Sequence, residues 1–183
     1  MRRWVKWLAL AVVALVVAGL VIAVVTVQPR LADARDSVDH AWAPLRVPLI
    51  ARYQRLGGVM VALDAAGARE RTVTKDLTAA LAQWQRTAPT DNPGAQAPLA
   101  DELEALALRA RVNVQHSDRL KANPGLLAAF GAYDQAIVNP PAVVAYNRAV
   151  STYQQRRTST AGRIVAALFG FGDRPVLTIV GGS

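Results

Sequence analysis

The N-terminal part of the chain is an almost unbroken run of apolar residues from Trp4 to Val27. No charged residue interrupts this run between Leu8 and Val25. A helix of about twenty such residues spans a hydrocarbon core roughly 30 Å thick. Because lipid offers no partners to free backbone amides, the run is predicted to form a transmembrane helix. The side chains expected to contact lipid are Leu8, Val12, Leu15, Leu20 and Val24.

The residues in front of this run indicate how it lies in the membrane. Arg2, Arg3 and Lys6 form a short basic segment, and Trp4 and Trp7 stand where an interfacial aromatic belt is expected. Positive charge before a first transmembrane helix favours a cytoplasmic N-terminus. We therefore expect a single-pass protein of the plasma membrane whose main domain is extracytoplasmic.

A cleaved signal peptide is the alternative explanation of the run. The apolar region of a signal peptide is normally about 7–15 residues long, which is shorter than the run here. Ala32 and Ala34 form an A-x-A pattern, but Pro29 and Arg30 separate them from the run. A buried core helix is disfavoured because the run has no polar stripe. These features favour an uncleaved anchor.

After Pro29 the spacing of apolar residues becomes that of an amphipathic helix. They recur every three or four positions, which predicts one buried helix face: Val38, Trp42, Leu45, Leu49, Tyr53 and Leu56. Pro44 and Pro48 conflict with this pattern, because a proline inside a helix costs about 3 kcal/mol. A kink or a local break is therefore expected between Ala43 and Leu49, and Gly57-Gly58 is a further weak point.

Three later segments repeat the helical spacing: Val59 to Trp84, Leu99 to Val114, and Val143 to Tyr153. Turn-forming residues divide them at 87–98, 121–125 and 139–141. The only candidate strand is the short segment from Val176 to Val180. The pattern predicts an all-α fold in which a single N-terminal transmembrane helix (residues 1–28) precedes an antiparallel bundle of three to four long helices (residues 29–183).

Composition narrows the chemistry that this domain can perform. The chain has no cysteine, which excludes disulfides, thiolate metal sites and cysteine nucleophiles. Its two histidines, His40 and His116, have no partners at ligand spacing. The formal charge of +8 is not concentrated in a dense basic stripe or a nucleic-acid-binding motif, so we expect no nucleic-acid partner. A modest positive excess near a membrane instead favours anionic head groups.

Neither acidic cluster of the sequence has the setting of an active site. Asp101, Glu102 and Glu104 could perform acid–base chemistry, but a solvated first helical turn is the favoured interpretation. Three aspartates on one helix face could bind a metal, but a solvated face is again favoured: Asp33, Asp36 and Asp39. We therefore expect no catalytic, cofactor-binding or metal-binding residues.

For some aromatic, polar and apolar residues the sequence is compatible with either a binding role or a structural role. Trp42 and Trp84 could line a ligand groove, although their helical spacing favours the core. Asn147, between Tyr146 and Tyr153, could bond a partner or the domain itself. A C-terminal apolar stretch with nearby arginines is a candidate membrane or partner contact, or else closes one end of the bundle. Its residues are Ile164, Leu168, Phe169, Phe171, Arg156, Arg157, Arg163 and Arg174.

Four segments in order carry a resemblance to a known family. They are Val38-Asp39-His40-Ala41-Trp42 with Leu49 and Arg52-Tyr53; Leu120-Lys121-Ala122-Asn123 with Leu126-Leu127; Tyr146-Asn147-Arg148-Ala149-Val150 with Tyr153; and Ala167-Leu168-Phe169-Gly170-Phe171 with Arg174-Pro175. In this order and spacing, behind one N-terminal anchor, they resemble the LemA family. The resemblance implies a membrane-anchored helical bundle without an established catalytic activity.

Two segments depart from the family pattern. Residues 55–60 (RLGGVM) stand where the family usually has Leu-Ile-Pro-Asn-Leu-Val, and 136–141 (AIVNPP) replace a polar Glu-Asn-Arg stretch. If those polar residues carry a shared role, this chain has lost it or has changed partner.

Three functions follow as hypotheses. The first is a non-catalytic interaction or scaffold module at the cell envelope, with membrane lipid and an unidentified protein as partners and a homo-oligomer left open. The alternative is a module that binds anionic lipid surfaces through the C-terminal segment. The third is an enzyme acting on envelope polymers, which a pocket lined by several carboxylates would favour.

Overall fold

The computed structural model describes residues 2–68 and 72–179, without the side chains of residues 2, 3, 5, 6, 8, 9, 16, 20 and 23. Every regular element in this part of the chain is a helix: α1 (Arg2–Ala65), α2 (Thr72–Thr87), α3 (Pro93–Gln115), α4 (Asp118–Lys121), α5 (Pro124–Asp134), α6 (Pro140–Thr158) and α7 (Thr160–Phe169). The predicted all-helical class is therefore confirmed for the described residues. The candidate strand is wrong as far as it is described, because residues 176–179 form no strand and Val180 lies outside the description.

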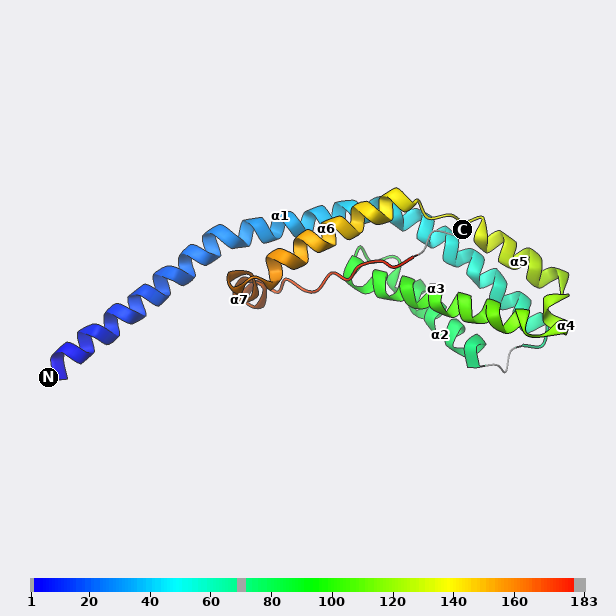
Figure 1. Ribbon diagram of the computed structural model, residues 1–183, viewed down its shortest axis with the longest axis horizontal. Coiled ribbons are helices and arrows are strands. Elements are labelled where there is room, and N and C mark those ends of the chain that lie inside the picture. The colour runs from blue at the N-terminus through cyan, green and yellow to red at the C-terminus, as the bar shows by residue number, and fades with distance from the viewer. Residues whose placement is uncertain (1, 69–71, 180–183) are drawn as a thin grey trace.

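Helix α1 is by far the longest element and joins the apolar N-terminal run to the rest of the molecule. Its 64 residues continue without interruption from the run into the folded part. Figure 1 shows it as a long arc, with its N-terminal part projecting alone and its C-terminal part covered by other helices. We call the projecting stretch, residues 4–27, the apolar segment, and the remaining described residues the body.

The three prolines inside α1 do not break it. Pro29, Pro44 and Pro48 all lie within the continuous helix, so of the kink or local break expected between Ala43 and Leu49, the break is wrong. Pro29 and Pro44 lie on the exposed side of α1. Long helices curve gently so that their exposed side is convex, and the backbone hydrogen bonds are longer on that side. The gentle arc of α1 in Figure 1 accommodates the missing backbone hydrogen bonds without ending the helix.

Burial of the opposite face explains why the helix survives these costs. The predicted stripe from Val38 to Leu56 is confirmed, and each of its six side chains is at most 2% exposed. The stripe also extends in both directions, to Leu31 and Ala34 before it and to Val59 and Leu63 after it. Each large apolar side chain that is fully buried contributes about 1.5–3 kcal/mol, so the stripe outweighs the proline penalties.

The other helices cover the body part of α1. Helices α2, α3, α5, α6 and α7 all contact it, and α2 and α3 pack against each other. Helix α6 runs antiparallel to α1, because Tyr146 packs against Trp42 in a tilted arrangement with ring centroids 5.0 Å apart, while Arg156 contacts the earlier residue Arg30. Figure 1 shows α6 alongside α1 and the α2–α3 pair on the other side of the body.

Two predicted boundaries are wrong. Helix α1 continues through Gly57-Gly58 and ends at Ala65, so the segment from Val59 to Leu63 belongs to α1 and not to the next helix. A Cβ atom at either glycine would meet nothing within 4 Å. The loop expected at 87–98 is shorter, since α3 already begins at Pro93. Proline at the first position of a helix loses no hydrogen bond, because that amide has no intrahelical partner. The interruptions at 121–125 and 139–141 are confirmed, as α5 begins at Pro124 and α6 at Pro140.

A sharp corner joins α6 to α7 and depends on one glycine. The Ser159 side chain caps α7 by accepting a hydrogen bond from the Gly162 amide at 3.1 Å. A Cβ atom at position 162 would lie 2.0 Å from the carbonyl oxygen of Arg156, so only glycine fits the corner. Gly170 then ends α7 with φ of +67°, a conformation that favours glycine. The chain continues as an extended tail, residues 171–179.

Candidate membrane and partner interface

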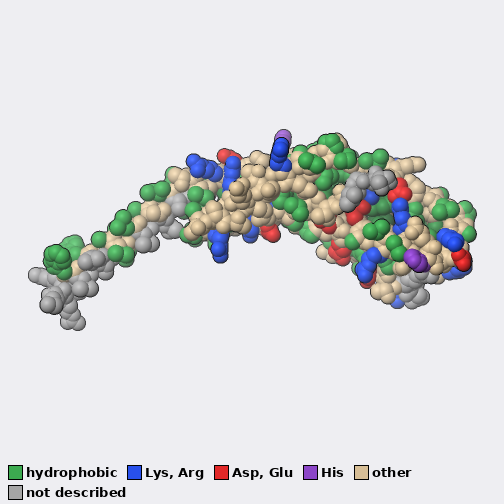
Figure 2. All heavy atoms as spheres, in the orientation of Figure 1, with side chains coloured by type: hydrophobic (Ala, Val, Ile, Leu, Met, Phe, Trp, Pro, Cys, Tyr) green, Lys and Arg blue, Asp and Glu red, His purple; other side chains and the backbone are tan. Residues whose placement is uncertain are grey.

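The apolar segment has the exposure expected of a helix surrounded by lipid. Within the described residues, one helix is long and apolar enough to cross a membrane, by length and composition alone, and its most apolar window has a mean hydropathy of 3.1 and no buried residue. Val12 is 52% and Leu15 73% exposed. Figure 2 shows hydrophobic side chains along this projecting rod.

The remaining predicted lipid contacts divide into two groups. The side chains of Leu8 and Leu20 lie outside the description. Val24 is only partly exposed and packs against the core of the body, as does Val27. The continuous exposed surface of the apolar segment therefore ends near Val25, just before the body.

Helix α7 lies at this same end of the body. It contacts α1, and the guanidinium of Arg156, at the end of α6, donates a hydrogen bond to the carbonyl oxygen of Arg30 at 2.8 Å. The α6–α7 corner is thus held close to the last residues of the apolar run. Figure 1 shows α7 at the end of the body from which the rod projects, viewed nearly along its own axis while α1 lies in the plane.

Some of the predicted C-terminal contact residues are exposed in the structure, and others are buried. Ile164, Leu168 and Phe169 are exposed at 44%, 60% and 50%, and Arg163 is exposed beside them. Phe171 and Arg174 are buried, so placing these two on an exposed membrane or partner surface is wrong; Phe171 reaches solvent only as part of the lining of a pocket at the α6–α7 corner. Both close the end of the body instead.

The three arginines of this region other than Arg163 have structural partners. Arg174 forms an ion pair with Asp39 on α1, with 3.2 Å between Nη2 and Oδ1. Arg157 donates from Nε to the carbonyl oxygen of Phe171 at 3.1 Å. Arg156 makes the contact with Arg30 described above. These three arginines therefore hold α1, α6 and the tail together.

The tail lies on α6, whose polar side chains bind its backbone. The hydroxyl groups of Tyr146 and Tyr153 donate to the carbonyl oxygens of Pro175 and Gly172, at 2.8 and 2.6 Å. The amide of Asn147 bonds both backbone groups of Leu177, donating to its oxygen and accepting from its nitrogen, each at 2.8 Å. Asn147 thus bonds the backbone of the tail as a neighbouring strand would. Of the two alternatives for Asn147, a partner or the domain itself, the structure shows hydrogen bonds within the domain.

Replacing Asn147 with alanine is expected to release the end of the tail. Two hydrogen bonds disappear, and the backbone groups of the buried Leu177 lose their partners, at a cost of about 1–3 kcal/mol. Limited proteolysis followed by mass spectrometry should show faster cleavage after residue 172 than in the unaltered chain. Asn113 on α3, replaced with alanine, is the control; equal cleavage in the two variants would contradict the assignment.

A charged network in the body was missed by sequence reasoning. Arg52 is 7% exposed and pairs with Glu104 through two hydrogen bonds, Nε to Oε1 at 2.6 Å and Nη2 to Oε2 at 2.8 Å. Its Nη1 donates to the carbonyl oxygen of Ala136 at 2.9 Å, and the guanidinium lies 4.1 Å from the ring centre of Tyr133. Burial lowers the pKa of Arg52, but the hydrogen bond to Glu104 and the charge interactions with Tyr133, Glu104 and Tyr53 together outweigh it, and the pKa is raised. The network joins α1, α3 and the end of α5.

All four tyrosines of the chain have raised pKa values, in each case chiefly because burial disfavours the phenolate. The folded state therefore holds these protons more tightly than the unfolded state above pH 10, the ordinary value. Stability must fall as the pH rises beyond this value, because the unfolded state then binds fewer protons.

The expected result is that tyrosine ionisation and unfolding occur together. Absorbance at 295 nm should rise only where helical circular dichroism is lost. Phenolate absorbance that rises near pH 10 with the helices intact would contradict the burial of these hydroxyl groups.

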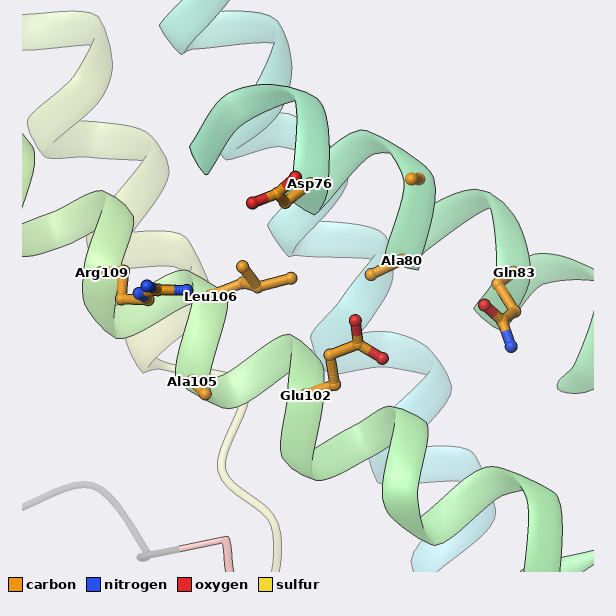
Figure 3. A pocket seen from close by; sticks show the side chains of 8 residues that line it. Asp76, Ala80, Gln83, Glu102, Ala105, Leu106 and Arg109 are labelled. Atoms are coloured by element: carbon orange, nitrogen blue, oxygen red, sulfur yellow. The ribbon is translucent and has the colours of Figure 1, made fainter. Parts of the chain in front are cut away.

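The three acidic residues of the cluster on α3 make different contacts. Asp101 accepts a hydrogen bond from the amide of Thr178 in the tail at 2.7 Å, and Glu104 pairs with Arg52. Glu102 lines an open cleft of about 320 Å³ between α2 and α3 with Asp76 and Arg109 (Figure 3). Asp76 and Glu102 are both exposed, so these carboxylates lie in a solvated groove between two helices.

The residues of the second acidic cluster and the two tryptophans likewise make different contacts. Asp33 and Asp36 line a shallow groove on α1, and Asp39 pairs with Arg174. Among the described residues no group of three or more metal-ligating side chains is assembled. The indole nitrogen of Trp42 donates to Gln96 inside the core at 2.7 Å, whereas Trp84 is 5% exposed and lines an apolar cleft between α1 and α2.

Comparison with known proteins adds no relative to this picture. No family model matches the chain, and neither the curated proteins nor the solved structures contain a match.

Proposed function

We propose that the chain is a single-pass membrane protein whose helical body is a non-catalytic interaction or scaffold module at the cell envelope. Residues 1–28 anchor it, and residues 29–183 form an antiparallel bundle of the LemA type. The observation that carries the proposal is α1, a single helix that is apolar and exposed at its N-terminal end and forms the buried spine of the body at the other.

Several features of the body support an interaction role. The carboxylates of Asp39, Asp101 and Glu104 are engaged in internal contacts that hold the helices and the tail. Leu108 and Val112 lie one turn apart on α3, and both are exposed, at 63% and 41%. Apolar side chains form the buried core of a protein contact, so this pair is a candidate centre for one.

Cross-linking in intact membranes tests this proposal. A photoreactive amino acid at Leu108 should give a discrete cross-linked product larger than the chain, whereas the same group at exposed Glu102 in the α2–α3 cleft should give less. A reporter fused after Ser183 should be active only outside the cytoplasm. A chain that cross-links to nothing, not even to a second copy, would contradict the interaction role.

A second candidate function is binding to an anionic lipid surface. It is favoured by the exposed side chains of Ile164, Leu168 and Phe169 together with Arg163, at the end of the body where the apolar segment begins. Apolar side chains flanked by basic residues suit the boundary between head groups and acyl chains. Vesicle flotation at low and high salt tests it, because attraction to anionic lipid weakens as salt rises.

A further inference from the structure

We propose that the α6–α7 corner contains a binding site for the phosphate of one anionic phospholipid. The site is a pocket of about 350 Å³ lined by Arg157, Thr158, Arg163, Ala166, Ala167 and Phe171. This inference rests on the proposed membrane anchoring and gives the lipid-facing end of the body a defined ligand.

The chemistry of the pocket suits a phosphate diester. Two guanidinium groups, from the end of α6 and from α7, border it, while alanine and phenylalanine side chains form its apolar part. Arginine presents planar pairs of N–H donors that match two phosphate oxygens, and such charge-assisted bonds are about twice as strong as neutral ones. The apolar part suits the glycerol and first methylene groups of a lipid.

Both arginines have capacity for a further anion. Arg163 is exposed and makes no ion pair or hydrogen bond through its guanidinium within the described residues. Arg157 uses Nε for the tail carbonyl of Phe171, and its Nη1 donates to Oε1 of Gln154 at 3.4 Å and lies 3.6 Å from Asp173, a carboxylate that is 67% exposed; its Nη2 has no partner within the described residues. The Arg157 side chain is 29% exposed, and an ion pair with so exposed a carboxylate contributes little, so a phosphate can share this guanidinium.

The place of the pocket in the molecule favours a lipid over a free phosphate ion. The contact between Arg156 and Arg30 holds the corner at the level where the apolar run ends. On the neighbouring surface of α7, Ile164 and Leu168 are exposed. A head group in the pocket would therefore have its acyl chains beside apolar side chains of α7 and α1. Basic residues at such a surface add to its attraction for anionic membranes.

Native mass spectrometry of the full chain in detergent tests the site. Phosphatidylglycerol and phosphatidylcholine of the same acyl composition are added in turn, and the lipid-bound fractions are compared. We expect one tightly bound phosphatidylglycerol and weaker binding of phosphatidylcholine. Arg163→Gln should weaken phosphatidylglycerol binding about tenfold to 150-fold, the range expected for loss of a charge-assisted hydrogen bond. The control is Arg109→Gln, which removes one exposed positive charge from the α2–α3 cleft and should leave binding unchanged.

Each alternative has its own outcome. Equal binding of the two lipids, or unchanged binding in Arg163→Gln, would overturn the proposal, and so would displacement of phosphatidylglycerol by a tenfold excess of inorganic phosphate. Circular dichroism should show that Arg163→Gln keeps its helices. Anchoring is measured separately by alkaline extraction of membranes: a variant that stays in the membrane but loses its lipid preference locates the effect in the pocket, not in the apolar segment.

Discussion

Replacing Val12 and Leu15 together with arginine is expected to remove the chain from membranes. Both side chains are exposed on the projecting part of α1, at 52% and 73%. Each arginine near the centre of a transmembrane helix costs about 2.5–3.5 kcal/mol in membrane insertion, so the pair costs roughly 5–7 kcal/mol. The double variant should appear in the soluble fraction after alkaline extraction, while the unaltered chain stays with the membrane.

Val47→Arg is the matched control for this experiment. Val47 lies on the same helix and is 75% exposed, but it belongs to the body. It should leave the chain in the membrane fraction, because an added charge there remains in water. Retention of the double variant in the membrane would show that the apolar segment is not embedded in lipid, and would contradict the proposed anchor.

Removing Glu104 is expected to have the largest effect on the stability of the body. Glu104→Leu leaves the guanidinium of Arg52 buried without its carboxylate, and breaking such a pair costs about 3–5 kcal/mol. Arg52→Met should cost less, because the Glu104 side chain is 20% exposed and can turn to water, whereas the Arg52 side chain is 9% exposed. Urea unfolding followed by circular dichroism in detergent measures both variants.

The double variant tests the cause of this effect. Arg52→Met with Glu104→Leu removes both charges, and replacing a buried ion pair with apolar side chains is often neutral or stabilising. We expect the double variant to be more stable than Glu104→Leu alone by at least about 1 kcal/mol. Simple addition of the two single effects would mean that the side chains act independently and that the unpaired charge is not the cause.

Periodicity predicted the parts of the fold that depend on one buried face. The spacing of Val38, Trp42, Leu45 and their successors identified the spine of the body because a helix buries residues at three- and four-residue intervals. The same rule located α6, whose Tyr146 and Tyr153 are buried on one face. The continuity of α1 through Pro44 and Pro48 could not be predicted in this way. It depends on how much side-chain burial on the opposite face offsets the proline penalty, which is known only once α6 and α5 are in place.

The candidate interface shows a similar limit. Composition indicated that apolar and basic residues gather near the C-terminus, but not which of them face outward. Phe171 and Arg174 turn inward because Gly170 redirects the chain and because Asp39, far away in the sequence, provides a carboxylate for Arg174. The Arg52–Glu104 pair likewise joins residues on different helices. The apolar residues Leu177 and Ile179, separated by one polar position in the sequence, were a usable signal for an extended tail. Both are buried, but side chains of α6 and α3 take the place of a partner strand.

The absence of a break in α1 also fixes how the body is turned about the axis of the apolar segment. Successive residues of an α-helix are rotated by about 100°, so one extra residue inserted between Gln28 and Arg30 would swing the body by about a quarter of a turn and move α7 to another side of the rod. An insertion of four residues would nearly restore the original azimuth. In a continuous helix, the number of residues between the apolar segment and the body therefore determines which face of the body is turned toward its neighbours in the membrane.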